Sequence, residues 1–538
     1  KTTAIYHHLP PPHHSSRVAL FQGCGARCPS LLSIEGNQMQ NEMAEQARLV
    51  PRPSVPLEEP SVIPSLLARL YVGHFLARWG GRMWEFAVGL YMISVWPYSL
   101  LFVAIYGAVE SASTALFGPI VGQWVDRLTY LKVLWLWCLT QFLSFTVAGG
   151  TVIVMLIYSR LKLTNFVAFI SLVVLTNVSG AVGVLANLAG TILIEREWVV
   201  VIAEGRPAEE LTQMNSVIRR IDLICKLFAP VATGFIISFM SLKASAMALA
   251  LWNCIAVWLQ YWLLLSVHEG VPALRGRSQR RTITLSLPND SMERLHAFQP
   301  ADSPHSSDAL SRIKKKIDWF LNIPLVAAWR VYLQQDALLP GVSLALLYFT
   351  VLSFGSLMTA TLEWEGIPTY IIGIGRGISA TIGISATILY PILHGKIGML
   401  RTGLWSIWSQ WTLLLICVGS IFVQHRISSS YMLMAGVAMS RLGLWMFDLS
   451  AIQQIQDLVP ESSRCVVGGV QSSLQSILDL MASVMGMILS NPQDFWKLIW
   501  VSFGAVTVAA VIYNLHVYRV RKHLFHWEKL PLLLRYFN

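Results

Sequence analysis

A regular series of long apolar runs is the feature that most limits what this chain can fold into. In a helix, which rises about 1.5 Å per residue, about 20 apolar residues cross the roughly 30 Å hydrocarbon core of a bilayer. Hydrophobic residues make up 54% of the 538 residues and charged residues only 13%, which leaves too little polar surface for a soluble protein. We therefore predict an all-α, polytopic membrane protein. The runs lie at 69–95, 98–123, 131–158, 164–194, 213–241, 244–267, 338–363, 369–394, 401–424, 429–458, 464–491 and 495–520.

These twelve runs form two sets of six on either side of a polar insert. The insert is rich in Pro, Ser and charged residues, and such a composition predicts a disordered or loosely held linker. Two helical halves joined by a long loop are typical of the major facilitator plan, in which the halves rock about a site near the middle of the membrane. The predicted parts are a disordered N-terminal tail (1–66), a first six-helix half (67–267), a cytoplasmic linker (268–318), a second six-helix half (319–520) and a cytoplasmic C-terminal tail (521–538).

The N-terminal tail is rich in Pro, Ser and His, and no acidic residue precedes Glu35. An acid-poor leader of this kind is compatible with an organelle transit peptide, although Arg is sparse in it. We favour the alternative that Met39 or Met43 is the natural start and that the earlier residues are upstream sequence.

Lys and Arg are concentrated in every second loop. Under the positive-inside rule, this bias places both termini and the linker in the cytoplasm. The same placement accounts for the net charge of +11 without a nucleic-acid partner, because the basic residues flank apolar runs. The basic residues on the predicted cytoplasmic side include Arg127, Lys132, Arg219, Arg220, Lys396, Arg401 and Arg464, besides those of the linker and the C-terminal tail.

One of these loops carries a pattern that facilitator transporters have after their second helix. In "GPIVGQWVDRLTYLKVL" the pattern consists of Gly122, Asp126, Arg127 and Lys132. Glycine permits a tight helix end, and Asp126 can cap the neighbouring helix. We expect Asp126 and Arg127 to contact the opposite half in one conformation only, as a gate. An ordinary charged loop is the alternative.

Charged and amide side chains within the apolar runs are the candidate functional residues. A charge at the centre of a bilayer costs roughly 3 kcal/mol or more and usually faces a protein interior or a water-filled path. Arg82 and Glu85 lie three residues apart, on one face of a helix. Asp222 and Lys226 have the spacing of a helical ion pair, which fits a structural role as well as a site. The full set is Arg82, Glu85, Glu110, Gln141, Asn177, Asn187, Asp222, Lys226, Asp448 and Asp479, in which Glu110 has no obvious partner in sequence.

The sequence lacks the motifs of enzymes and ATP-driven pumps. It contains no HExxH, no GxSxG and no phosphate-binding loop. Few histidines lie within the runs and the seven cysteines lack zinc-site spacing, so a zinc cage is not expected. A divalent cation at membrane depth would be held by carboxylates, amide oxygens, Met sulfur or water. We therefore predict a transporter, not an enzyme, with no cofactor.

Several longer stretches together resemble one family, the ferroportins or solute carrier family 40 iron exporters. The similarity extends over residues 69–520, and "GVSLALLYFTVLSFGSLMTATLEWEGIPTYIIGIGRGISA" is most similar to the plant iron-regulated branch. The resemblance implies export of ferrous iron from the cytosol by alternating access, linked to proton exchange in animal members. The matching blocks are "LYVGHFLARWGGRMWEFAV", "GQWVDRLTYLKV", "EREWVVVIAEG", "MNSVIRRIDLICKLFAPVATG", "RLGLWMFDL" and "ESSRCVVGGVQSSLQSILDLM".

The resemblance also implies one metal site in each half. In the first half, an Asp and a His of the animal pattern fall at Gly81 and Glu85, so the Asp is lost and a carboxylate replaces the imidazole. An Asn of that pattern falls at Lys226, whereas a glutamine is kept as Gln141. We predict that Glu85, Gln141 and Asp222 bind metal, and that Lys226 neutralises Glu85 when metal is absent.

The second-half site departs further from the animal pattern. A Cys becomes Ser356, after Gly355, and a His becomes Ala482, so regulation by the vertebrate peptide that docks on that Cys is not expected. The remaining candidates, Ser356, Asp448, Asp479 and Met481, form a harder and weaker ligand set, at which cobalt and nickel should compete with iron. The predicted gating or charge-pairing residues are Arg82, Asp126, Arg127, Lys226, Arg441 and Arg464.

Two other functions are alternatives to metal export. One is a proton-coupled organic-solute facilitator of the same fold, and the other is a membrane receptor or scaffold with vestigial ligands. For an exporter with cytoplasmic termini, the vacuolar membrane and the plasma membrane are both compatible, because the cytoplasm lies on the same side of the protein in each. We expect a monomer whose partners are divalent metal ions and lipid.

Overall fold

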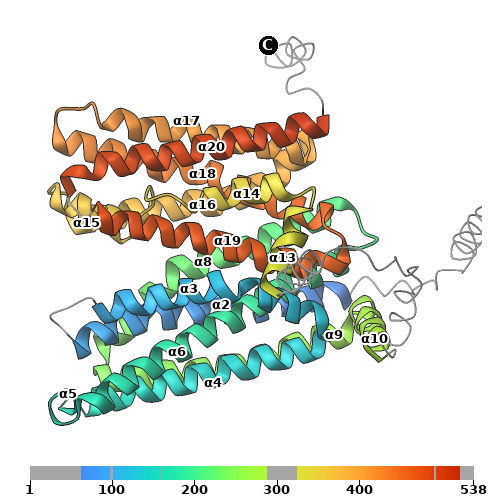
Figure 1. The fold of residues 1–538 in the computed structure, drawn as a ribbon, viewed down its shortest axis with the longest axis horizontal. Coiled ribbons are helices and arrows are strands. Elements are labelled where there is room, and N and C mark those ends of the chain that lie inside the picture. Colours follow the sequence, from blue (N-terminus) through green and yellow to red (C-terminus); the bar gives the residue numbers. More distant parts are fainter. Residues whose placement is uncertain (1–61, 97–100, 159, 287–323, 490–491, 522–538) are drawn as a thin grey trace, which may run out of the picture. The chain divides into compact units, whose positions relative to one another are not determined.

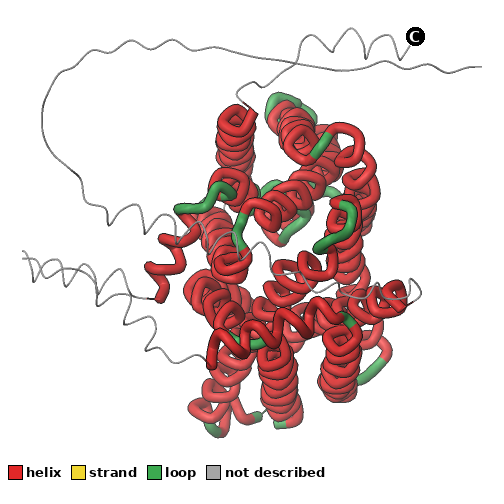
Figure 2. The backbone as a smooth tube through the Cα atoms, turned by 90° about the vertical axis from the view of Figure 1, so that its right-hand side faces the viewer, coloured by secondary structure: helices red, strands yellow, loops and turns green. Residues whose placement is uncertain are grey.

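The computed structural model of the chain describes residues 62–96, 101–158, 160–286, 324–489 and 492–521. Within these ranges the chain forms helices and turns and no strand, which confirms the predicted all-α class (Figure 2). The first half consists of α2 (Val62–Val95), α3 (Leu101–Arg127), α4 (Tyr130–Ile157), α5 (Leu161–Thr164), α6 (Phe166–Thr191), η1 (Ile192–Trp198), α7 (Val199–Ala203), α8 (Ala208–Phe239), α9 (Leu242–Gly270) and α10 (Pro272–Ser286). The second half consists of α13 (Pro324–Leu333), α14 (Leu338–Leu346), α15 (Ser356–Trp364), α16 (Thr369–Ile397), α17 (Met399–Ser420), α18 (Arg426–Leu458), α19 (Glu461–Ile488), η2 (Pro492–Asp494) and α20 (Phe495–Arg521).

Helices occupy each of the apolar runs predicted from the sequence. In the described ranges, 7 helices are long and apolar enough to cross a membrane, among them the continuous stretch Phe166–Ala203 of 38 residues. The count of twelve spans therefore stays a prediction. The run predicted at 338–363 differs most in shape, because it forms two short helices, α14 and α15, with residues 347–355 between them.

The break between α14 and α15 exposes backbone groups that side chains from other helices bind. The N–H of Val351 donates to Ser502 Oγ at 3.0 Å, and Arg441 of α18 donates to the carbonyl of Leu352. Non-helical backbone at membrane depth is tolerated only where protein satisfies it in this way. Arg441, predicted to pair with another charge, thus binds backbone, and it forms no ion pair within the described part of the chain.

The fourth run contains a widened helical turn. Here α6 continues through the π-helical turn η1 into α7. Such turns are rare and often lie at functional sites. Glu195, Arg196 and Glu197 follow one another on η1, and none of them is more than 7% exposed. Because buried charges are costly without partners, η1 must lie next to groups that compensate them.

Each half has its own hydrophobic core. Tyr91, Leu134 and Trp198 are fully buried in the first half, and Phe447 and Tyr513 are fully buried in the second. Many large apolar side chains of the outer helices are exposed instead. Extensive exposed apolar surface is what a lipid-facing protein presents.

The two halves meet along α3 and α19, which approach closely through glycines (Figure 1). A Cβ atom added to Gly122 would lie 2.5 Å from the carbonyl oxygen of Cys465. One added to Gly118 would lie 2.9 Å from the carbonyl oxygen of Gly469. The expectation that Gly122 ends a helix is wrong, because this glycine lies inside α3 and permits the close contact between the halves.

The expectation of a disordered linker is wrong for its first part. Helix α9 extends to Gly270, and residues Pro272–Ser286 form α10, which packs against α9 and α7 (Figure 1). We refer to the end of the helical bundle where α10 lies as the α10 end. Residues 287–318 and most of both predicted tails lie outside the described residues.

Candidate functional site

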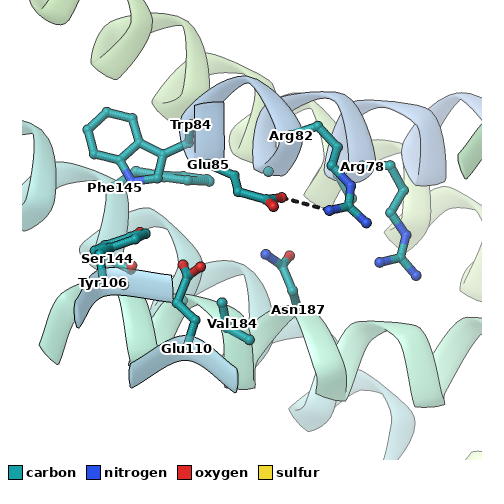
Figure 3. Close-up of a pocket in the computed structure, with 14 residues that line it drawn as sticks. Arg78, Arg82, Trp84, Glu85, Tyr106, Glu110, Ser144, Phe145, Val184 and Asn187 are labelled. Atoms are coloured by element: carbon teal, nitrogen blue, oxygen red, sulfur yellow. Dashed lines mark hydrogen bonds and ion pairs between the residues drawn. The ribbon is translucent and has the colours of Figure 1, made fainter. Parts of the chain in front are cut away.

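A cavity of about 160 Å³ lies inside the first half, between α2, α3, α4 and α6 (Figure 3). Two carboxylates enter it, Glu85 from α2 and Glu110 from α3, and both point into the same space. Asn187 of α6 places an amide group beside them. Carboxylate and amide oxygens are suitable ligands for divalent cations, so this cavity, which we call the first-half cavity, is a candidate metal site.

Arg82 is the ion-pair partner of Glu85. Its Nη1 atom lies 2.6 Å from Glu85 Oε2, one turn away on α2. The two side chains are 39% and 54% exposed, so the pair is open to exchange with another ligand. The prediction that Lys226 pairs with Glu85 is wrong for this conformation, because Lys226 lines a different cavity and forms no ion pair within the described ranges.

Glu110 was a candidate functional residue in the sequence, but it was not among the predicted metal ligands, and the structure places it in this site. A Cβ atom on Gly81, where the animal pattern has an Asp, would lie 3.6 Å from Asn187 Nδ2, so this position borders the cavity. The carboxylate that α2 lacks at Gly81 is therefore matched by one from α3. The available signal was an acid without a partner inside an apolar run, but the sequence does not show that α3 faces α2 here.

Gln141, predicted to bind metal, does not line the first-half cavity. It is 1% exposed on α4, and the residues that α4 contributes to the cavity are Ser144 and Phe145. Its Oε1 atom has no hydrogen-bond partner among the described residues. A metal role for Gln141 therefore has no geometric support in this conformation.

A second group of ligand-type side chains lies beside the part of α2 that precedes Glu85, and its members come from three helices. The ligand atoms of His74 (α2), Glu195 (η1) and Asp222 (α8) all lie within 4.8 Å of one another, and we call these residues the buried triad. His74 Nε2 is 3.3 Å from Asp222 Oδ1. Arg78 contacts both carboxylates, with Nε 2.9 Å from Asp222 Oδ1 and Nη2 3.0 Å from Glu195 Oε1.

Arg219 of α8 connects the triad to the second half. Its Nη1 atom is 3.4 Å from Asp222 Oδ2, and its Nη2 atom is 2.7 Å from Asp448 Oδ2 on α18. Asp222 thus pairs with Arg78 and Arg219, and the helical pair with Lys226 does not form. Asp448 was predicted to bind metal, but in this conformation an arginine holds it and joins the halves.

A cavity of about 260 Å³ between the halves holds most of the other predicted charged residues. Asp479 lines it, whereas the side chain of Ser356, at the start of α15, lies outside what the structure describes. No group of three His, Cys or acidic ligands forms in the described part of the second half. The charged side chains that line this cavity are Arg82, Arg219, Lys226, Arg441, Asp222, Asp448 and Asp479.

Helix α10 bridges the two halves at its end of the bundle. Arg277 pairs with Glu204 of the first half at 2.5 Å and also with Glu461, the first residue of α19. Nearby, Asn215 of α8 donates to Gln456 of α18 at 2.6 Å. These contacts close the α10 end in this conformation.

The predicted gate residues, Asp126 and Arg127, form no ion pair with the second half in the described part of the chain. Asp126 lies 4.0 Å from Arg281 of α10, and its partner is therefore not a residue of the second half. The N-cap of α4 is Thr129, not Asp126. Arg127 forms no ion pair in the described ranges, and buried Arg464 leaves Nε and Nη1 without a hydrogen-bond partner there.

The carboxyl of Asp126 at this end has a pKa shifted toward neutral pH. Burial raises the pKa of Asp126 from 3.8 to about 6, with Glu197 and Glu461 adding repulsion and Arg281 and Arg127 opposing the shift. A carboxyl with a raised pKa stabilises the closed conformation when it is protonated. That stabilisation is fully present below about pH 4 and is lost as the pH rises through about 6.

We therefore predict that mild acid favours closure of the α10 end. The reactivity of Cys465 reports on this closure, because its thiol is fully buried and lies 3.3 Å from Glu197 where the two halves are in contact. Its rate of alkylation, normalised to that of the unfolded chain, should be roughly fourfold lower at about pH 5.5 than at about pH 7.5. Asp126→Asn should remove this pH dependence. Equal normalised rates in the unmutated protein would contradict the assignment.

Two helical halves that close against each other at one end and hold charged cavities within the bundle define a membrane transporter of the major facilitator type. The sequence profile of the family described as Ferroportin1 (FPN1) matches residues 64–506. The chain belongs to the ferroportin family, a family of iron transporters, as its sequence blocks indicated.

Curated relatives and solved structures agree with this assignment. Solute carrier family 40 member 2 of Arabidopsis thaliana is 59% identical over 484 residues, covering 89% of this chain and 94% of the relative. Human ferroportin is 30% identical over 521 residues, covering 82% and 90% of the two chains. Because family members are membrane transporters, the prediction that the chain is not an enzyme is confirmed.

The solved structures confirm the fold. A bacterial homologue of ferroportin, in an outward-facing state with soaked iron, superposes with a TM-score of 0.68 at 22% identity, over 84% of this chain and 99% of that one. The proton:xylose symporter XylE, a major facilitator protein, superposes with a TM-score of 0.59 at 14% identity, over 84% and 95% of the two chains. The chain is therefore a multi-pass integral membrane protein of the major facilitator fold.

Proposed function

We propose that this protein exports ferrous iron from the cytosol by alternating access, with the first-half cavity as its metal site. The observation that supports this most is the convergence of Glu85, Glu110 and Asn187 on one cavity of about 160 Å³. Membership of the ferroportin family makes iron the first candidate substrate.

Metal binding at this site would exchange one partner of Glu85 for another. Without metal, Arg82 compensates the charge of Glu85 at 2.6 Å. A divalent cation between Glu85 and Glu110 would replace that pairing, and Arg82 also lines the cavity between the halves, where its guanidinium has space. The exchange leaves Glu85 with a positively charged partner in either state, which limits the cost of burying its charge.

The ligand types fit weak binding and modest selectivity. The residues that line the first-half cavity include carboxylates and an amide but neither a thiol nor an imidazole. Such oxygen ligands hold divalent ions loosely, and by the Irving–Williams order they favour cobalt and nickel over iron. We therefore propose that cobalt and nickel are also carried.

The direction of transport follows from the proposed orientation. The α10 end would face the cytoplasm, because the loops at this end carry the excess of Lys and Arg. This structure then corresponds to the conformation closed to the cytoplasm by Arg277, from which metal leaves on the opposite side. Metal binding to two facing carboxylates releases any proton they hold, which supports a link to proton exchange.

Either the vacuolar membrane or the plasma membrane would make such a protein an exporter from the cytosol. We propose the vacuolar membrane first, because an acidic lumen supplies protons for exchange. Imaging of a fluorescent fusion in root cells distinguishes the two membranes.

Uptake of ferrous iron into proteoliposomes tests the proposed function. We expect saturable iron uptake that excess cobalt or nickel inhibits, because the same oxygen ligands bind all three ions. Protein-free liposomes, and liposomes that contain an unrelated facilitator, are the controls. Proton-coupled flux of an organic solute without metal flux would favour the alternative facilitator, and the absence of any flux would favour a receptor or scaffold.

A further inference from the structure

We propose that the buried triad of His74, Glu195 and Asp222 is a second divalent-cation site, and that the guanidinium of Arg78 takes the place of the metal in this conformation. The inference rests on the proposed transport of metal, and it adds a binding step between the α10 end and the first-half cavity. Three observations support the inference: the ligand types, the position of Arg78, and the cavities on either side of the triad.

The triad has the composition and spacing of a metal site. An imidazole nitrogen and two carboxylate oxygens come from α2, η1 and α8, and these atoms all lie within 4.8 Å of one another. Ligands that bind one divalent ion at roughly 2.1 Å are about 3 to 4 Å apart. The longest of these separations would therefore have to shorten by about 1 to 2 Å to complete three bonds. His74 is only 2% exposed, so its nitrogen is shielded from competing water.

Arg78 supplies a positive charge to both carboxylates, of which Glu195 is buried and Asp222 partly buried. It contacts Asp222 at 2.9 Å and Glu195 at 3.0 Å, and it also donates to Thr191 Oγ1 at 2.8 Å. A cation in contact with both carboxylates stands where a bound ion would neutralise them. The other nearby cation, Arg219, is shared with Asp448 and does not contact Glu195 within the hydrogen-bond and ion-pair distances of this structure.

The triad lies between the two charged cavities. Arg78 lines the first-half cavity, and Asp222 lines the cavity between the halves. Arg78 thus has space to turn toward Glu85 and Glu110 when it leaves the triad. One side chain would then compensate whichever pair of carboxylates lacks metal, so the ion and the guanidinium would exchange places as the ion advances.

The order of sites along α2 gives this exchange a direction. Helix α2 begins at the α10 end, where Leu66 packs against Gly270 just before α10. An ion that arrives from that end therefore meets His74 before it meets Glu85. Access would require the pair between Arg219 and Asp448 to open, because this pair closes the triad on the side of the second half.

Titration of the purified full-length protein with Co²⁺ tests the proposal. Arg78→Gln should bind Co²⁺ at least about fivefold more tightly than the unmutated protein, because an occupant that excludes the metal is removed. The visible absorption of the bound Co²⁺ should also change as a nitrogen ligand joins. Adding His74→Gln to Arg78→Gln should abolish both effects.

Two further variants keep the test decisive. Arg82→Gln is the matched control, since it frees Glu85 but leaves the triad paired, and any change that it causes should not depend on His74. Thr191→Val removes one acceptor of Arg78 with little change in shape, so it should strengthen Co²⁺ binding in the same direction by a smaller factor. This variant carries the test if Arg78→Gln does not fold.

The outcomes separate this inference from the proposed function. Co²⁺ binding to the unmutated protein that neither Arg78→Gln nor Thr191→Val strengthens would overturn the inference and leave metal transport standing. A gain that persists in the double variant with His74→Gln would also overturn it. The absence of Co²⁺ binding in every variant would overturn both.

Discussion

Glu85→Gln should reduce iron uptake into proteoliposomes by at least about tenfold while the protein still folds. Glutamine keeps the size and the hydrogen bonding of the side chain but removes the charge that faces Glu110 in the first-half cavity. Cobalt and nickel uptake should fall in parallel, because the same oxygen atoms serve all three ions. The measurement is the initial uptake rate of each metal at equal amounts of reconstituted protein.

Two variants accompany this prediction. Glu209→Gln removes an exposed carboxylate at the start of α8, and its uptake should match that of the unmutated protein. Glu85→Gln with Arg82→Gln removes both members of the ion pair, and it should restore the expression level without restoring transport. If Glu85→Gln transported all three metals at the normal rate, Glu85 would have only a structural role and the metal path would lie elsewhere.

Arg219→Gln should lower the free energy of unfolding by about 3 to 5 kcal/mol, because it leaves Asp448 buried without its partner. Asp448 is 2% exposed and 2.7 Å from Arg219, whereas Asp222 keeps Arg78. The same change removes a link between the halves. Thermal unfolding of the detergent-purified protein measures the loss as a lower transition temperature.

Two comparisons test whether the loss of stability comes from the buried pair between Arg219 and Asp448. Arg219→Gln with Asp448→Asn removes both charges and should recover most of the lost stability. Arg206→Gln breaks the partly exposed pair between Arg206 and Glu210, 3.0 Å apart, and should cost less than about 1 kcal/mol. Equal transition temperatures for Arg206→Gln and Arg219→Gln would show that the buried pair does not contribute to stability.

The helices were predictable because long apolar runs have few alternatives in a membrane. All twelve predicted runs contain helices, and the boundaries of α4 and α20 lie within a few residues of the prediction. The break between α14 and α15 was not predictable, because it depends on Ser502 and Arg441 from distant helices. Helix α10 was missed because its composition is that of a linker, and its ion pairs are with residues far away in sequence.

The candidate site was predictable only in part, for a related reason. Glu85 was identified because a single acid in an apolar run is conspicuous, and its pair with Arg82 has helical spacing. Its predicted pairing with Lys226 required α2 and α8 to face each other in a particular register, and no pattern within one helix gives that register. Glu110 was noticed in the sequence, but its place opposite Glu85 depends on how α3 packs against α2.

The π-helical turn η1 has a consequence for how a bound ion and the closed end of the protein affect each other. Glu195 belongs to the triad and pairs with Arg78, whereas Glu197, two residues later, accepts from Tyr130 at 2.8 Å and pairs with Arg281 of α10 at 3.1 Å. The carboxylates at the two places thus lie on one turn of backbone. If an ion binds the triad as proposed, a rotation of η1 toward it would also move Glu197 relative to α10, so the ion and the α10 end would be coupled through one turn of backbone.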